Sequence, residues 1–172
     1  EATEAELMAV PGVGENVATY LTLITAAGRY YQMCRSERPV ILDSTEKYGR
    51  YLQDLFYGRR NEMVYLLCLD AKCKVLTCKE IGEGSVNSAG VPIRRIVDVA
   101  LKLNASTVIL AHNHPGGVAV PSIDDMQTTE RVSQALAGVD VILLDHLVFA
   151  DGDYISMVDS GHYRPAEYTV WR

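Results

Sequence analysis

The stretch from Ser106 to Asp125, STVILAHNHPGGVAVPSIDD, constrains the fold of this chain more than any other. It opens with an apolar, β-branched run from Thr107 to Leu110, which is typical of a buried strand. A Pro-Gly-Gly turn and a loop follow, and Ser122 stands where a helix begins. The sequence therefore predicts a strand, a loop and a helix in succession, with polar side chains at the junctions.

Two histidines and a carboxylate stand at these junctions. His112 and His114 follow the predicted strand two residues apart, and Asp125 falls in the first turn of the predicted helix. Alternation along a strand would put both imidazoles on one face. Two imidazoles and one carboxylate are a typical ligand set for zinc with one position left open. We therefore expect a zinc site formed by His112, His114 and Asp125.

The same residues also have a structural explanation that needs no metal. Ser122 and Asp125 have the spacing of a helix N-cap and its partner, and the helix dipole favours an acid in the first turn. Either histidine could be a core residue bonded to the backbone. The ligand interpretation is favoured because the three residues occur together beside a glycine-rich turn.

A hydrolytic zinc site also needs a general base that lies near the metal without binding it. Glu62 is the main candidate, because it opens a buried strand, where an acid is costly unless it faces a polar site. A solvated strand end explains its position equally well. The other acidic candidates are Glu80, Glu83, Asp98 and Asp124.

The rest of the chain alternates strand-like and helix-like patterns. Strands are expected at 63–69, 74–81, 106–111, 139–149 and 154–157, helices at 44–57, 92–104 and 122–136, and a glycine-rich loop at 82–90. This order predicts an α/β or α+β core of three layers from about Pro39 onward. The tail from 161 to 172 shows no clear pattern.

Residues 4–35 predict two helices joined by the turn Pro11-Gly12-Val13-Gly14. This pattern resembles the helix-hairpin-helix module, whose turn amides hold a DNA phosphate. An ordinary helical hairpin explains it as well, and little positive charge precedes Arg29. DNA binding through Pro11, Gly12 and Gly14 stays an alternative, and we expect residues 1–36 to be a shortened module of this kind.

Composition narrows the function further. With 172 residues, of which 48% are hydrophobic, the chain suits one core domain and a small appendage. A net charge of −6 argues against non-specific nucleic-acid binding over the whole surface. No two of the four cysteines have C-x-x-C spacing, and no signal peptide or membrane span is evident. We expect a cytoplasmic protein without disulfides and without membrane contact.

The quoted motif resembles that of a known family. The spacing resembles the JAMM (MPN+) metalloprotease pattern. In this pattern seven residues separate His114 from Ser122, two more separate Ser122 from Asp125, and a glutamate stands at the start of an upstream strand. The combination NHP-x-G with P-S-x-x-D is similar to the bacterial RadC family, also described as DNA repair RadC-like proteins. One departure is Gly116, where the family usually shows serine.

The resemblance covers most of the chain. It extends to the Asp145-His146 pair and to Tyr154-Ile155-Ser156, so that residues 37–172 would form the MPN (JAMM) domain. The family's core is a mixed sheet flanked by helices, similar to the cytidine-deaminase-like fold.

The resemblance also implies an activity, the hydrolysis of peptide or isopeptide bonds. His112, His114 and Asp125 would bind Zn²⁺, with water as the fourth ligand. Glu62 would take the proton of the water and give it to the leaving amine. Ser122 would donate a hydrogen bond to the oxyanion. His146 would be either a structural residue or a support for the ligands.

Two other functions compete with hydrolysis. In the first, the chain is a non-catalytic DNA-associated module, and zinc only stabilises the fold. The second, nucleobase deamination, expects H-x-E and P-C-x-x-C, and neither is present. The sequence does not name the peptide or protein substrate. A homo-oligomer is compatible with sheet edges beside either predicted hairpin.

Overall fold

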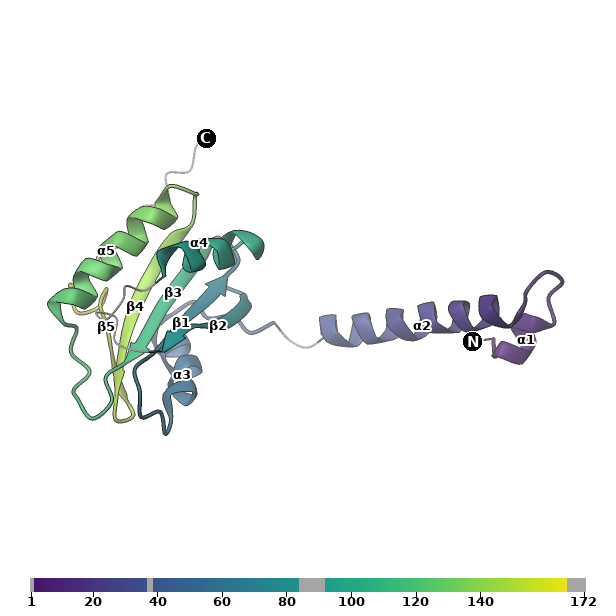
Figure 1. Ribbon diagram of the computed structural model, residues 1–172, viewed down its shortest axis with the longest axis horizontal. Coiled ribbons are helices and arrows are strands. Elements are labelled where there is room, and N and C mark those ends of the chain that lie inside the picture. The colour runs from purple at the N-terminus through teal and green to yellow at the C-terminus, as the bar shows by residue number, and fades with distance from the viewer. Residues whose placement is uncertain (1, 37–38, 84–91, 167–172) are drawn as a thin grey trace. The chain divides into compact units, whose positions relative to one another are not determined.

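The computed structural model of the chain describes residues 2–36, 39–83 and 92–166. The chain divides into two compact units between residues 39 and 40. The first unit holds α1 (Glu4–Met8) and α2 (Glu15–Ser36), and the second holds the mixed helical and strand part (Figure 1). The predicted glycine-rich loop lies outside the described residues from residue 84 onward. No helix in the described ranges is long and apolar enough to cross a membrane.

The second unit is built on a five-stranded sheet with the order β2-β1-β3-β4-β5. β1 is antiparallel to both β2 and β3, β3 is parallel to β4, and β5 returns antiparallel to β4. The predicted α+β class is therefore confirmed. In chain order the elements are α3 (Thr45–Phe56), β1 (Met63–Leu69), β2 (Val75–Glu83), α4 (Ile93–Lys102), β3 (Thr107–Asn113), α5 (Ile123–Ala137), β4 (Ile142–Ala150) and β5 (Asp153–Ser156).

The sheet is the middle of three layers. Side chains of β1 and β3 alternate between two cores, because successive residues of a strand point to opposite faces. Leu66 and Leu110 pack on one face with residues of α4 and α5. Leu67 and Ile109 pack on the other face with residues of α3. The two central strands are buried almost throughout, which agrees with their continuously apolar sequences.

β3 is longer than the sequence predicts. The predicted strand ended at Ala111, but the pairing continues through His112, which lies opposite Val64, to Asn113, which lies opposite Phe149. The expectation that both histidines lie beyond the strand was therefore wrong for His112. The strand was predicted from its apolar residues alone, so the polar residues His112 and Asn113 at its end were not included.

Gly49 allows α3 to lie close to β5. A methyl group at Gly49 would overlap the ring of Tyr154, which packs at 5.3 Å against the ring of Phe149. We expect Gly49→Ala to lower the free energy of unfolding of the second unit by about 1–3 kcal/mol, because the ring must shift. The measurement is chemical denaturation. In a Tyr154→Leu background the same substitution should cost less, and an equal cost in both backgrounds would contradict the overlap.

Candidate metal centre

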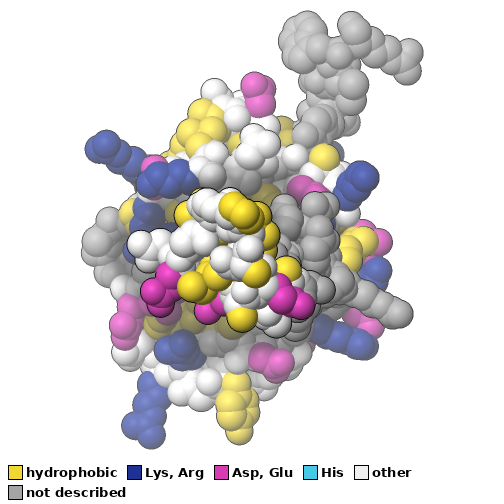
Figure 2. All heavy atoms as spheres, turned by 90° about the vertical axis from the view of Figure 1, so that its right-hand side faces the viewer, with side chains coloured by type: hydrophobic (Ala, Val, Ile, Leu, Met, Phe, Trp, Pro, Cys, Tyr) yellow, Lys and Arg dark blue, Asp and Glu magenta, His cyan; other side chains and the backbone are white. Residues whose placement is uncertain are grey.

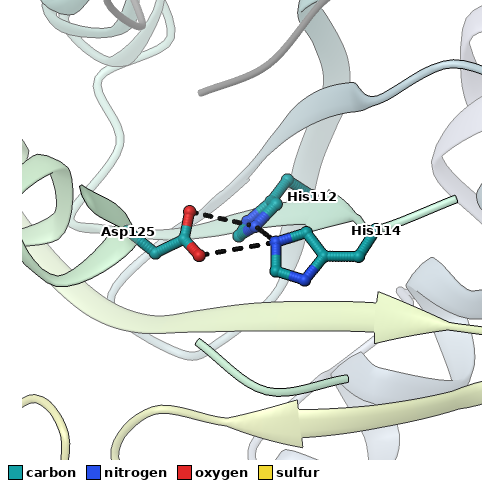
Figure 3. A group of neighbouring side chains, drawn as sticks. All are labelled: His112, His114 and Asp125. Atoms are coloured by element: carbon teal, nitrogen blue, oxygen red, sulfur yellow. Dashed lines mark hydrogen bonds and ion pairs between the residues drawn. The ribbon is translucent and has the colours of Figure 1, made fainter. Parts of the chain in front are cut away.

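β3 and α5 bring the three predicted ligands together (Figure 3). His112 lies in β3, two residues after Leu110, and its side chain is fully buried on the α5 face of the sheet. His114 follows the strand, and Asp125 lies in the first turn of α5 with 2% of its surface exposed. One potential ligand atom from each residue lies within 4.8 Å of the others. The structure thus contains a His-His-Asp group that can hold a metal ion.

The separations of the ligand atoms suit a small tetrahedral ion. The two Nε2 atoms of His112 and His114 are 2.9 Å apart. His112 Nε2 lies 3.2 Å from Asp125 Oδ1, and His114 Nε2 lies 3.4 Å from Asp125 Oδ2. Bonds of 2.0–2.1 Å to a tetrahedral zinc ion would place ligand atoms about 3.3 Å apart. The three groups therefore need little movement to close around such an ion.

The hydrogen bond of His114 indicates which of its nitrogens faces the other ligands with a lone pair. His114 Nδ1 lies 3.2 Å from the backbone oxygen of Val118. A carbonyl oxygen only accepts, so we assign the ring proton of neutral His114 to Nδ1 from this contact. Its Nε2 then presents a lone pair to the carboxylate of Asp125. Electron-rich atoms facing one another in this way are stabilised by a cation between them.

Ser122 orients the Asp125 carboxylate. Both the N–H and the hydroxyl of Ser122 donate to Asp125 Oδ2 at 2.7 Å, and the Asp125 N–H donates back to Ser122 Oγ at 3.1 Å. This is the capping box that the spacing suggested, and it coexists with the approach of Asp125 to the imidazoles.

The carboxyl group of Asp125 is ionised at neutral pH. Burial raises its pKa, but the closeness of the His112 imidazole, followed by the hydrogen bonds of Ser122, lowers it by more than burial raises it. The pKa of Asp125 therefore lies well below its usual range. An ionised carboxylate is the form that binds a metal.

Glu62 directly precedes β1 at the same end of the sheet. Met63 donates its N–H to Asn113 Oδ1 at 2.7 Å, and the Asn113 amide donates to the backbone oxygen of Asn61 at 3.2 Å. Asn113, which stands between the two histidines in the sequence, thus pins the chain on both sides of Glu62. Glu62 is half-buried, and within the described ranges it has no hydrogen-bond or ion-pair partner.

Most of the other acidic candidates have partners away from the histidines. Glu80 accepts from the hydroxyl of Tyr65, on the α3 side of the sheet. Glu83 accepts from the Asn61 side chain, and Asp98 pairs with Lys102 along α4. Asp124 is exposed on the first turn of α5.

A cleft of about 440 Å³ adjoins His114, one of the three candidate ligands. His114 forms part of its lining, together with residues at the end of α3 and at the ends of β3 and β4. Its aromatic wall includes Phe56 and Phe149, whose rings stack at 4.6 Å, and the exposed Tyr57. Any group bound in this cleft would therefore lie directly beside His114.

Sequence patterns did not indicate Thr129, they included Asn113 in the motif without a role in holding Glu62, and they left the role of His146 open. His146, in β4, is fully buried, and its Nε2 lies 2.8 Å from His112 Nδ1. Burial is the main reason why the pKa of His146 lies well below its ordinary value, followed by repulsion from His112. Thr129 stands four residues after Asp125, and that helical spacing was the one available signal.

The turn at Pro11, Gly12 and Gly14 lies in the first unit, between α1 and α2. Gly12 has a φ of +88°, which glycine adopts readily. The first turns of the two helices carry the acidic residues Glu4, Glu6 and Glu15. Figure 2 shows hydrophobic and acidic side chains together on the face that is turned toward the viewer. These charges would repel a DNA phosphate.

Comparisons with known proteins support the family resemblance that the motif indicated. Residues 42–162 match the family model described as the RadC-like JAB domain. The chain is 36% identical over 160 residues to a UPF0758 protein of Idiomarina loihiensis, a match that covers 93% of this chain and 71% of that protein. It is 39% identical, with the same coverage, to a UPF0758 protein of Aeromonas hydrophila. A UPF0758 protein of Photobacterium profundum is 42% identical over 121 residues, or 70% of this chain and 54% of the relative.

Proposed function

This chain belongs to the RadC-like JAB domain family, and we propose that it is a zinc-dependent hydrolase of peptide or isopeptide bonds. One observation carries the proposal, namely the convergence of the Nε2 atoms of His112 and His114 with the Asp125 carboxylate. Two imidazoles and one carboxylate leave a fourth position open, as catalytic zinc sites do and closed structural sites do not.

When bound, the ion would act as a Lewis acid that polarises a scissile carbonyl and makes a water molecule acidic enough to attack at neutral pH. His112, His114 and Asp125 would hold the ion. Glu62 would accept a proton from the attacking water and return it to the leaving amine. The half-buried position of Glu62, its lack of a partner among the described residues and the pinning of its backbone by Asn113 support this role.

We propose Ser122 as the donor to the oxyanion of the tetrahedral intermediate. Its hydroxyl now donates to Asp125 Oδ2, so it would have to turn toward the substrate oxygen during the reaction. The backbone N–H of Ser122 donates to the same carboxylate oxygen at 2.7 Å. Asp125 would therefore keep one hydrogen bond to Ser122 while the hydroxyl serves the substrate.

The cleft beside His114 supports a polypeptide substrate. Aromatic side chains on its wall suit an apolar residue of an extended peptide, and Arg59 adds a cation to the lining. A peptide bond held next to this cleft would lie within reach of the candidate metal. We therefore expect a protein or peptide substrate whose reacting bond lies in an accessible, extended segment.

Removal of the metal tests this proposal most directly. We expect dialysis against a chelator to lower hydrolysis of a random peptide library by more than about 10²-fold, because the charge stabilisation by the ion is worth several kcal/mol. Zinc added back should restore it, with products read by mass spectrometry. Chelator already saturated with zinc is the matched control. Undiminished hydrolysis in the metal-free protein would overturn the proposal.

A further inference from the structure

His146 stands behind His112, on the side away from His114. It lies in β4 opposite Leu110, and the parallel pairing of β3 and β4 brings it to the His112 ring. His112 Nδ1 and His146 Nε2 are 2.8 Å apart, and both rings are fully buried. Two buried imidazoles in direct contact constrain each other, because one nitrogen of the pair must donate and the other must accept.

The contacts continue from His146 into α5. Its Nδ1 lies 2.6 Å from Thr129 Oγ1, and Thr129 Oγ1 lies 2.6 Å from the backbone oxygen of Asp125. The chain of contacts thus begins at one ligand, His112, and ends at the backbone of another, Asp125. Thr129 Oγ1 also has a longer contact with the Met157 sulfur, at 3.5 Å.

The direction of each hydrogen bond in this series follows from its last acceptor, the backbone oxygen of Asp125. A backbone carbonyl oxygen only accepts, so the Thr129 hydroxyl donates to Asp125. Thr129 Oγ1 then accepts the Nδ1–H of His146, which leaves His146 Nε2 with a lone pair in the neutral ring. That lone pair accepts from His112 Nδ1–H. By this assignment His112 Nε2 carries no proton and faces the other two ligands.

We propose that Thr129 and His146 are positioning residues that fix the tautomer of His112 and present its Nε2 lone pair to the metal. This inference rests on the proposed metal centre but not on hydrolysis. In this arrangement the backbone carbonyl group of Asp125 in α5 determines, through Thr129 and His146, which ring nitrogen of His112 in β3 carries the proton. The Asp125 carboxylate would then bind the ion directly, and the Asp125 backbone would orient a second ligand, His112, for the same ion.

The backbone of β4 holds His146 in place. Asp145 accepts the His146 N–H at 2.7 Å and the Val158 N–H at 3.2 Å on one carboxylate oxygen. Its other oxygen accepts from the hydroxyls of Tyr48 at 2.9 Å and Ser156 at 2.6 Å. Asp145 and His146 point to opposite faces of the sheet, so this network anchors the imidazole from the α3 side. Such partners of metal ligands usually set ring orientation.

The tautomers can be read directly by NMR of ¹⁵N-labelled protein, with and without zinc. We expect the ring proton on Nδ1 in both His112 and His146 in the wild type. A proton on Nε2 of His146 in the wild type would overturn the proposal. Because the metal-free protein can be measured too, this result does not depend on whether the protein hydrolyses a peptide.

Metal affinity gives the second test. We expect Thr129→Val to weaken Zn²⁺ binding by about 10–100-fold, the usual loss when a partner of a metal ligand is removed. Thr129→Ser keeps the hydroxyl and should bind zinc as the wild type does. Thr128→Val, which removes a hydroxyl from the neighbouring buried position of α5, should also bind normally. Competition with a chromophoric chelator measures all four affinities.

The outcomes separate a positioning role from a merely structural one. Weaker zinc binding in Thr129→Val, with an unchanged melting temperature of the metal-free protein and a changed His146 tautomer, supports the proposal. Equal affinity in Thr129→Val and Thr128→Val would overturn it. Should the wild type bind zinc but fail to cleave peptides, the proposed hydrolysis would fall and the positioning role would stand.

Discussion

Replacing Glu62 by glutamine should leave zinc bound and lower peptide hydrolysis by about 10²–10⁴-fold, the usual contribution of a positioned general base. The substitution keeps the size of the side chain and removes only its ability to accept a proton. Zinc content should stay at the wild-type level, because Glu62 is not among the grouped ligands. Turnover of a peptide substrate and metal analysis of the same samples give both results together.

Glu80→Gln is the matched control for this experiment. Glu80 lies on the neighbouring strand β2 and accepts a hydrogen bond from Tyr65, so it should be dispensable for turnover. Equal turnover in wild type and Glu62→Gln would remove Glu62 as the base. A protein that binds zinc and cleaves nothing in either form would favour a metal that only stabilises the fold.

Loss of a ligand should have the second large effect. We expect about one zinc ion per chain in the wild type, and little retained zinc in His114→Ala or Asp125→Asn, because each variant loses one of three protein ligands. Asp125→Asn is the sharper variant. Its amide oxygen can still accept from the Ser122 N–H, so the helix cap is kept while the charge is removed.

His162→Ala serves as the control for these ligand variants. His162 is exposed near the end of the described chain, and its ring nitrogen Nδ1 lies 2.8 Å from Ser160 Oγ, so replacing it should leave zinc content unchanged. Metal analysis after equilibrium dialysis checks the whole set. Full zinc content in Asp125→Asn would show that the carboxylate is not a ligand.

Much of the architecture could be predicted from local patterns. β1 was predicted with its observed bounds, because MVYLLCL is continuously apolar and bounded by polar residues. The start of α5 was marked by Ser122, whose side chain caps it as its spacing with Asp125 suggested. The grouping of His112, His114 and Asp125 was equally local, since all three lie in one strand-loop-helix segment.

Other features depend on contacts that no local pattern records. The buried end of β3 is polar, and it is tolerated because His146 and the Met63 N–H satisfy the side chains of His112 and Asn113. In the patternless tail, Tyr163 is buried and donates its hydroxyl to the backbone oxygen of Leu143. Both features depend on segments that are distant in the sequence and that only the fold brings together.

From the parallel pairing of β3 with β4 we expect the candidate centre to assemble in a fixed order during folding. Parallel neighbours require a crossover, and here the crossover element is α5, which carries Asp125. The three candidate ligands belong to one strand-loop-helix segment and can meet as soon as α5 docks on β3. His146 arrives only when β4 inserts at the far side of β3, a contact between distant parts of the chain that forms more slowly. An ion captured early would thus be loosely held until the last central strand locks the imidazole behind it.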